Sequence, residues 1–136
     1  MLDLVIPSPL DAHTVRLKVV GEIRYGPTYS AVFIDEVEVP GLQVGDNAEW
    51  LSPHVVALQE WLHVAGREGP DTRVLLIDAE RRRSYRTSVV DRGLVEDFRF
   101  RDGVLSYRKN YFGHERPPGE EATIALADID AWVDLG

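Results

Sequence analysis

Cysteine is missing from the 136-residue chain. Its absence excludes disulfide bonds, thiolate metal sites, iron–sulfur clusters and a cysteine nucleophile. Long apolar runs are missing as well, because no stretch approaches the roughly 20 residues that span a bilayer. The N-terminal sequence has no basic segment ahead of its short apolar stretch, as a secretory signal would have. We therefore expect a cytoplasmic protein with no membrane partner.

Cations are scarce, and most of them lie between residues 67 and 116. The sequence carries 15 Lys and Arg against 23 Asp and Glu, a formal net charge of −8. Residues 1–66 hold three of the cations and residues 117–136 hold none. Because Lys and Arg supply most of the non-specific affinity for phosphate backbones, this balance argues against a nucleic-acid partner. It favours a basic protein as the partner.

The remaining composition is typical of one folded domain. Hydrophobic residues make up 44% of the chain, which is enough to bury a core at this length. No stretch resembles a flexible linker, so we expect a single domain over residues 1–136.

Period-two alternation of apolar and polar residues is the clearest pattern. It predicts a strand with one buried face over residues 15–23. A second strand is predicted over residues 29–34, where β-branched and aromatic residues are frequent. The pair Asp35-Glu36 is expected to form a tight turn into a strand over residues 37–39, which Pro40-Gly41 is expected to end.

The second half of the chain contains three further strand signals. Residues 73–78 are apolar without alternation, which predicts a central strand covered on both faces. Asp102-Gly103 tolerates the positive φ values of a type I′ turn, so the flanking segments are expected to form a hairpin. Residues 122–126 offer a last strand. Residues 128–133 are expected to form a short C-terminal helix with Ile129, Trp132 and Val133 inward.

Many short strands with turn signals at close intervals predict a mainly β fold, an antiparallel meander or sandwich. The longest loops are expected at residues 40–47, 66–71 and 114–119. One segment is ambiguous. Ser52-Pro53 before an apolar run, with Gly66 after it, suits a helix over residues 53–65, and that alternative would make the fold α+β. A strand over the same residues is slightly favoured.

Trp50, Ser52-Pro53 and the apolar run after them resemble the start of a blade strand in TolB-like and WD-type β-propellers. The resemblance covers about residues 49–112 and extends to small uncharacterised bacterial domains with this blade pattern. A closed propeller needs at least four blades of about 40 residues, more than this chain holds. The resemblance therefore implies blade-like strands and brings no catalytic residues with it.

No arrangement of residues in the sequence indicates a catalytic centre. The four histidines, His13, His54, His63 and His114, show no spacing typical of a metal site. Serine-hydrolase and phosphate-binding motifs are also missing. The sequence thus predicts no catalytic residue, no metal ligand and no cofactor, and an enzyme is the less favoured class.

The leading hypothesis is a non-enzymatic acidic protein-interaction module, in its sharpest form an inhibitor or immunity-type protein that masks a basic partner. It rests on carboxylates concentrated in one region and on aromatic residues beside a Gly-Pro loop, since Tyr and Arg are enriched at protein interfaces. The candidate partner-binding residues are Asp35, Glu36, Glu38, Asp46, Glu49, Arg24, Tyr25 and Tyr29.

Two alternatives remain open. A small-ligand or carbohydrate-binding β domain would use Trp50, Trp61, Tyr25 and Tyr29 as its binding surface. A subunit of a larger β assembly, including a homo-oligomer, would use the edge strands of a short meander.

Overall fold

The computed structural model describes residues 3–22, 28–62, 71–111 and 119–135. Within these ranges the chain forms strands and two short 3₁₀ helices and no α-helix, which confirms the mainly β prediction. No helix in the described ranges is long and apolar enough to cross a membrane. The strands are β1 (Leu4–Pro7), β2 (Thr14–Glu22), β3 (Thr28–Ile34), β4 (Val37–Trp50), β5 (Val55–Leu62), β6 (Asp71–Asp78), β7 (Arg83–Arg86), β8 (Gly93–Arg101), β9 (Val104–Tyr111), β10 (Glu120–Ala125) and β11 (Val133–Asp134). The 3₁₀ helices are η1 (Pro9–Asp11) and η2 (Leu126–Asp128).

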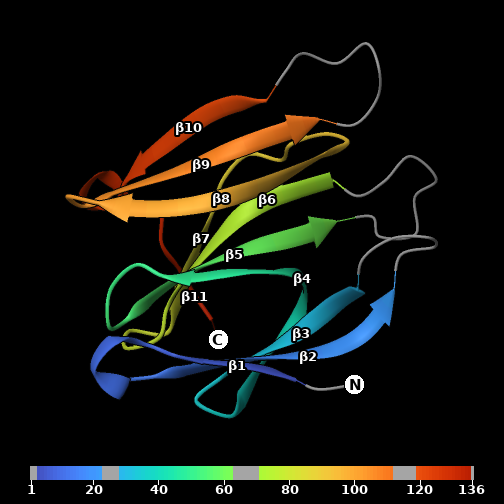
Figure 1. The fold of residues 1–136 in the computed structure, drawn as a ribbon. Coiled ribbons are helices and arrows are strands. Elements are labelled where there is room, and N and C mark those ends of the chain that lie inside the picture. Colours follow the sequence, from blue (N-terminus) through green and yellow to red (C-terminus); the bar gives the residue numbers. More distant parts are fainter. Residues whose placement is uncertain (1–2, 23–27, 63–70, 112–118, 136) are drawn as a thin grey trace.

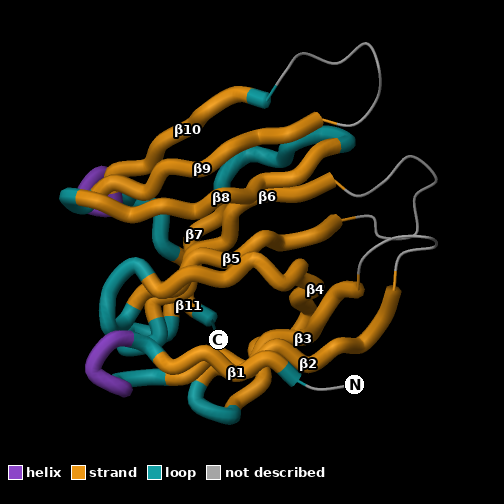
Figure 2. Tube along the Cα trace, in the orientation of Figure 1, coloured by secondary structure: helices purple, strands orange, loops and turns teal. Residues whose placement is uncertain are grey.

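These strands form two antiparallel sheets (Figure 1). The larger sheet has the order β1-β2-β3-β4-β5-β6-β7-β11, so seven of its strands follow one another as a meander and β11 returns to the far edge. The smaller sheet has the order β10-β9-β8. Short turns join β3 to β4, β4 to β5, β6 to β7 and β8 to β9, as Figure 2 shows, and turn signals at close intervals predict such connections.

The large sheet bends sharply along β4. The first part of β4 pairs with β3 and its last part pairs with β5, and only Val44 has partners in both strands. The register shifts on both sides of this point, as expected where bulges bend a strand. The bend brings β1 to β3 against β5 and β6 (Figure 1).

Two apolar cores result from this arrangement. The first lies inside the bend, between side chains of β2, β3 and β4 on one side and of β5 and β6 on the other. The second lies between the opposite face of β5 and β6 and the small sheet, and includes Ala57, Leu76 and Leu105. Strands β5 and β6 are therefore the middle layer, buried on both faces, which confirms the prediction for residues 73–78.

The predicted turns and alternation are confirmed at three places. Strand β2 alternates a buried Val15 and Leu17 with more exposed neighbours. Asp102 and Gly103 both have positive φ values, 52° and 77°, as a type I′ hairpin turn requires. Asp35 and Glu36 form a tight turn of the same kind, with φ values of 49° and 66°.

Two predictions for residues 40–47 are wrong. Pro40-Gly41 does not end the strand, and no long loop follows, because β4 continues to Trp50. Gly41 has a φ of 80°, a conformation open to glycine, and the strand passes through this point as an irregularity instead of stopping.

Gly45, further along the same strand, is buried, and a Cβ there would lie 2.0 Å from Gln59 Oε1.

Within residues 53–65 the structure has the strand β5, which begins at Val55. The helix alternative is therefore not found, and neither is the α+β alternative. Residues 63–65 lie outside the described ranges. Ser52 Oγ accepts the backbone N–H groups of His54 and Val55 as a helix cap would. The segment nevertheless pairs with β4 and β6 on its two sides. Pairing and burial on both faces outweigh the local helix signal.

The short C-terminal helix predicted over residues 128–133 is also wrong. The chain leaves η2 in extended conformation and pairs with β7 through Val133 and Asp134. Ile129 and Trp132 pack against the second core as expected, but Val133 is 59% exposed. Sheet pairing at the free edge of β7 uses the backbone groups that a helix would have bonded internally.

Candidate functional site

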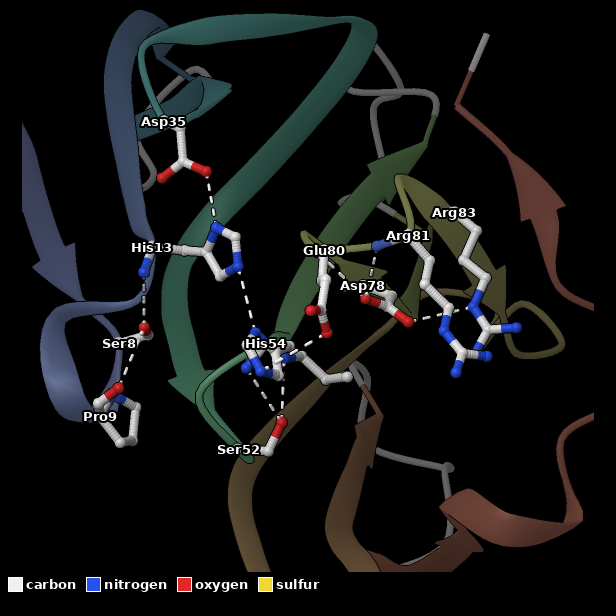
Figure 3. A network of polar contacts seen from close by, with 11 residues as sticks. Ser8, Pro9, His13, Asp35, Ser52, His54, Asp78, Glu80, Arg81 and Arg83 are labelled. Atoms are coloured by element: carbon white, nitrogen blue, oxygen red, sulfur yellow. Dashed lines mark hydrogen bonds and ion pairs between the residues drawn. The ribbon is translucent and has the colours of Figure 1, made fainter.

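Four turns meet at one end of the bent sheet. They are the β1–β2 connection, the β3–β4 turn, the β4–β5 turn and the β6–β7 turn, and each contributes one side chain to a line of polar contacts (Figure 3). We call this line the histidine chain; its members, in order, are Asp35, His13, His54 and Glu80.

The contacts of the histidine chain run from one carboxylate to the other. Asp35 Oδ2 lies 2.7 Å from His13 Nδ1. His13 Nε2 lies 3.2 Å from His54 Nδ1. His54 Nε2 lies 3.5 Å from Glu80 Oε2, an ion-pair distance. All four imidazole nitrogens therefore face a partner that belongs to the histidine chain.

Local contacts hold Asp35 and His13 in place. Thr14 donates its N–H to Asp35 Oδ1, and Asp35 donates its own N–H to the Thr14 carbonyl. Ser8 Oγ accepts the backbone N–H of His13. The ring of Trp50 stacks on that of His13, with 6.5 Å between centroids, and its indole N–H donates to the Ile6 carbonyl.

Electrostatics favour the charged form of Asp35. Burial by itself raises the pKa of this carboxyl group, but the hydrogen bonds from His13 and from the Thr14 N–H oppose that effect. The positive charge of Arg82, and that of His13 when it is protonated, oppose it as well, and the pKa of Asp35 is lowered below its ordinary value. This end of the molecule thus stabilises a carboxylate beside an imidazole.

The histidine chain is not arranged as a catalytic triad. Each imidazole is oriented by a carboxylate, as in a general base, but the inner nitrogens face each other. In the described ranges no serine hydroxyl is bonded to either ring, since Ser8 and Ser52 engage backbone groups. What the arrangement does is connect four turns that are distant in sequence.

The candidate partner-binding carboxylates fall into two groups. Asp35 belongs to the histidine chain, and Glu36 pairs with Arg16, which also binds Asp3. By contrast, three candidates are exposed and form no ion pair with another described residue. Glu22, which is not among the candidates from the sequence, is also exposed and also lacks such an ion pair. These four free carboxylates are Glu22, Glu38, Asp46 and Glu49.

The structure does not gather the candidates into one compact patch. Glu38 lies opposite Phe33 in the first half of the bent sheet. Glu49 lies opposite Ala57 in the second half, on the face that carries the small sheet. The bend in β4 separates these two positions, so their proximity in sequence is not proximity on one surface.

The aromatic candidates are separated as well. Trp50 is at the end with the histidine chain, whereas Trp61 is near the opposite end of β5 and only 3% exposed. Trp61 donates its N–H to Gln59 Oε1, and Tyr29 packs against its ring. Arg24 and Tyr25 lie outside the described residues, as do His63 and His114.

Sequence reasoning did not find the pairing of His13 with His54. The two residues are 41 positions apart, and neither has a histidine or carboxylate at a spacing that indicates a site. The available signal was that both flank strand ends, His13 before β2 and His54 before β5.

Comparison with known proteins returned no matching family model, no matching curated protein and no matching solved structure. The resemblance of residues 49–112 to propeller blades therefore stays an interpretation of the sequence.

Proposed function

We propose that the protein is a non-enzymatic interaction module that binds a basic protein partner. The observation that carries this proposal is an excess of carboxylates over cations in the first half of the chain. Residues 3–22 and 28–62 hold nine carboxylates against two cations, Arg16 and Lys18. Arg16 is already shared by Asp3 and Glu36.

The free carboxylates make this excess available to a partner. Glu22, Glu38, Asp46 and Glu49 are exposed on β2 and β4, and none of them forms an ion pair with a cation in the described ranges. Charges of one sign on a surface accelerate association with a partner of opposite sign, and they do so less as salt rises. An inhibitor that masks a basic surface is a protein that would use this property.

The ligand-binding alternative has weaker support. Trp61 is buried with its indole N–H bonded to Gln59, and Trp50 uses its N–H to hold Ile6. A sugar-binding platform needs an aromatic face open to the ligand, and these two rings pack against the protein's own side chains.

The test is capture of partners from a lysate of the native host at low and moderate salt, followed by association kinetics with any basic protein retained in stoichiometric amount. We expect an association rate that falls steeply as salt rises. In the double variant E38K/E49K the rate at low salt should fall by about tenfold or more.

A matched control separates the effect of the free carboxylates from that of net charge alone. The double variant D128K/D130K changes the net charge by the same amount at two exposed positions near the C-terminus. It should reduce the association rate much less than E38K/E49K. Equal effects of the two variants, or a rate independent of salt, would contradict the proposal.

A further inference from the structure

The two inner nitrogens of the histidine chain, His13 Nε2 and His54 Nδ1, face each other. A carboxylate only accepts hydrogen bonds, so Asp35 favours a proton on His13 Nδ1 and Glu80 favours one on His54 Nε2. A neutral imidazole has one donor nitrogen and one acceptor nitrogen. With both rings neutral, His13 Nε2 and His54 Nδ1 are both acceptors, and they face each other across 3.2 Å.

Two facing acceptors need a proton or a metal ion between them. The separation matches a metal ion well, because two imidazole nitrogens at 2.0–2.1 Å from a tetrahedral Zn²⁺ are about 3.3 Å apart. The surroundings of the outer nitrogens, His13 Nδ1 and His54 Nε2, also suit metal-binding histidines. Metal-binding histidines commonly donate their second N–H to a carboxylate, which fixes the tautomer and the ring orientation. Asp35 occupies that position at hydrogen-bond distance from His13, and Glu80 lies at ion-pair distance from His54.

We propose that His13 Nε2 and His54 Nδ1 bind a divalent transition-metal ion, with Zn²⁺ the best match to two imidazole ligands, and that Asp35 and Glu80 orient the two rings. An ion can reach the site from solvent, since the His54 side chain is 41% exposed. The neighbouring charges are the two carboxylates and, across from Asp35, Arg82.

Only two ligands come from the described protein. In those ranges no group of three or more His, Asp or Glu residues is placed to hold a metal ion. Water would therefore fill the remaining coordination positions, which leaves the ion open on its solvent side. The bound ion would join the β1–β2 connection to the β4–β5 turn. This role is independent of a basic partner.

The first test is titration of the full chain with Zn²⁺ by isothermal calorimetry at neutral pH. We expect saturable binding of one ion, lost in H13Q and in H54Q. The matched controls are H63Q and H114Q. They remove the other two histidines of the protein and should leave Zn²⁺ binding intact. Absence of saturable binding, which would mean that the two rings share only a proton, overturns the proposal. Binding that survives H13Q and H54Q does the same.

A second test leaves both ligands in place, in case the histidine variants fold poorly. The variants D35N and E80Q should each weaken Zn²⁺ binding by about 10–100-fold, the usual effect of losing a carboxylate behind a ligating histidine. Glu80 is 61% exposed, so E80Q should fold normally. Unchanged affinity in both variants would overturn the proposal.

Trp50 provides an independent readout, because its ring stacks on His13. Cu²⁺, which binds imidazole more tightly than Zn²⁺, should quench a fraction of the tryptophan emission. That fraction should disappear in W50F, whereas Trp61 and Trp132 continue to emit. Equal quenching of the native protein and W50F would place the ion elsewhere and contradict the proposed site.

Discussion

Asp35 links the β3–β4 turn to the β1–β2 connection, because one of its carboxylate oxygens accepts from His13 and the other from the Thr14 N–H. Its lowered pKa means that the folded state favours the charged form. The resulting stability is present above the ordinary pKa of an aspartate, near 4, and is lost as the pH falls through the lower pKa of the folded state.

We therefore expect D35N to lower the free energy of unfolding by about 1 kcal/mol at pH 7, a value kept small because the side chain is 45% exposed. The loss should shrink at pH 3, below the ordinary pKa of an aspartate, where part of the stability that the charged form provides is already lost. Urea unfolding at the two pH values measures this. D46N, which removes a carboxylate without an ion pair, should have little effect at either pH. An equal loss for D35N at both values would show that charge is not the cause.

Individual site residues were only partly predictable. The sequence identifies Asp35 and Glu36 as turn residues and as candidate partner-binding residues, and the first of these predictions is confirmed. Their pairing with His13 and Arg16 depends on strand register, which local patterns do not contain. The contact between His13 and His54 depends further on the bend in β4, so no spacing rule reveals it.

At the scale of the element, β4 depends on Gly45. A Cβ at this position would lie 2.0 Å from Gln59 Oε1 and 2.9 Å from Trp61 Nε1. Gln59 is buried and bonds both the Val95 carbonyl and the Trp61 indole N–H. A methyl group at position 45 would displace this amide and leave buried polar groups without partners.

We expect G45A to lower the free energy of unfolding by about 2–4 kcal/mol, measured by urea denaturation. G41A is the comparison, since Gly41 has open space around it and a φ of 80°. G41A should lower the free energy of unfolding by only about 1 kcal/mol, because its only cost is that of placing a side chain at a positive φ. A G45A protein as stable as the native one would mean that the Gln59 contact is not restrictive.

Strands with alternating residues and turns with a clear φ requirement were predictable, as β2 and the β8–β9 hairpin show. The errors occur where tertiary pairing competes with a local signal. Pro40-Gly41 normally ends a strand, and Asp128 normally starts a helix. In this fold the C-terminal segment pairs with the free edge of β7. Strand β4 passes Pro40-Gly41 through a register shift and resumes its pairing with β3 at Val44.

At the scale of the whole molecule, stability should be greatest in the middle layer. Strands β5 and β6 are paired on both sides and buried on both faces. Strand β1 pairs on one side only, and β11 has two residues. Local opening costs least where few apolar contacts and hydrogen bonds are lost.

Hydrogen exchange followed by NMR or mass spectrometry should therefore find the slowest amide protons in β5 and β6 and rapid exchange in β1 and β11. The mainly β class and the central position of residues 73–78 were predictable from composition and periodicity. The bend that creates the middle layer was not, because it arises from register shifts in β4. Protection of β1 equal to that of β5 would contradict this view of the fold.

The middle layer also affects how the chain folds while it is being made. The first core can close once β6 has left the ribosome, because all its buried members precede residue 80. The opposite face of β5 and β6, with Val55, Ala57 and Leu76, is covered only when Leu105 and Tyr107 arrive. At about 5–20 residues per second, that is roughly one to six seconds later. During this interval a nascent chain exposes an apolar sheet face, and binding by a chaperone or by a neighbouring nascent chain competes with completion of the fold.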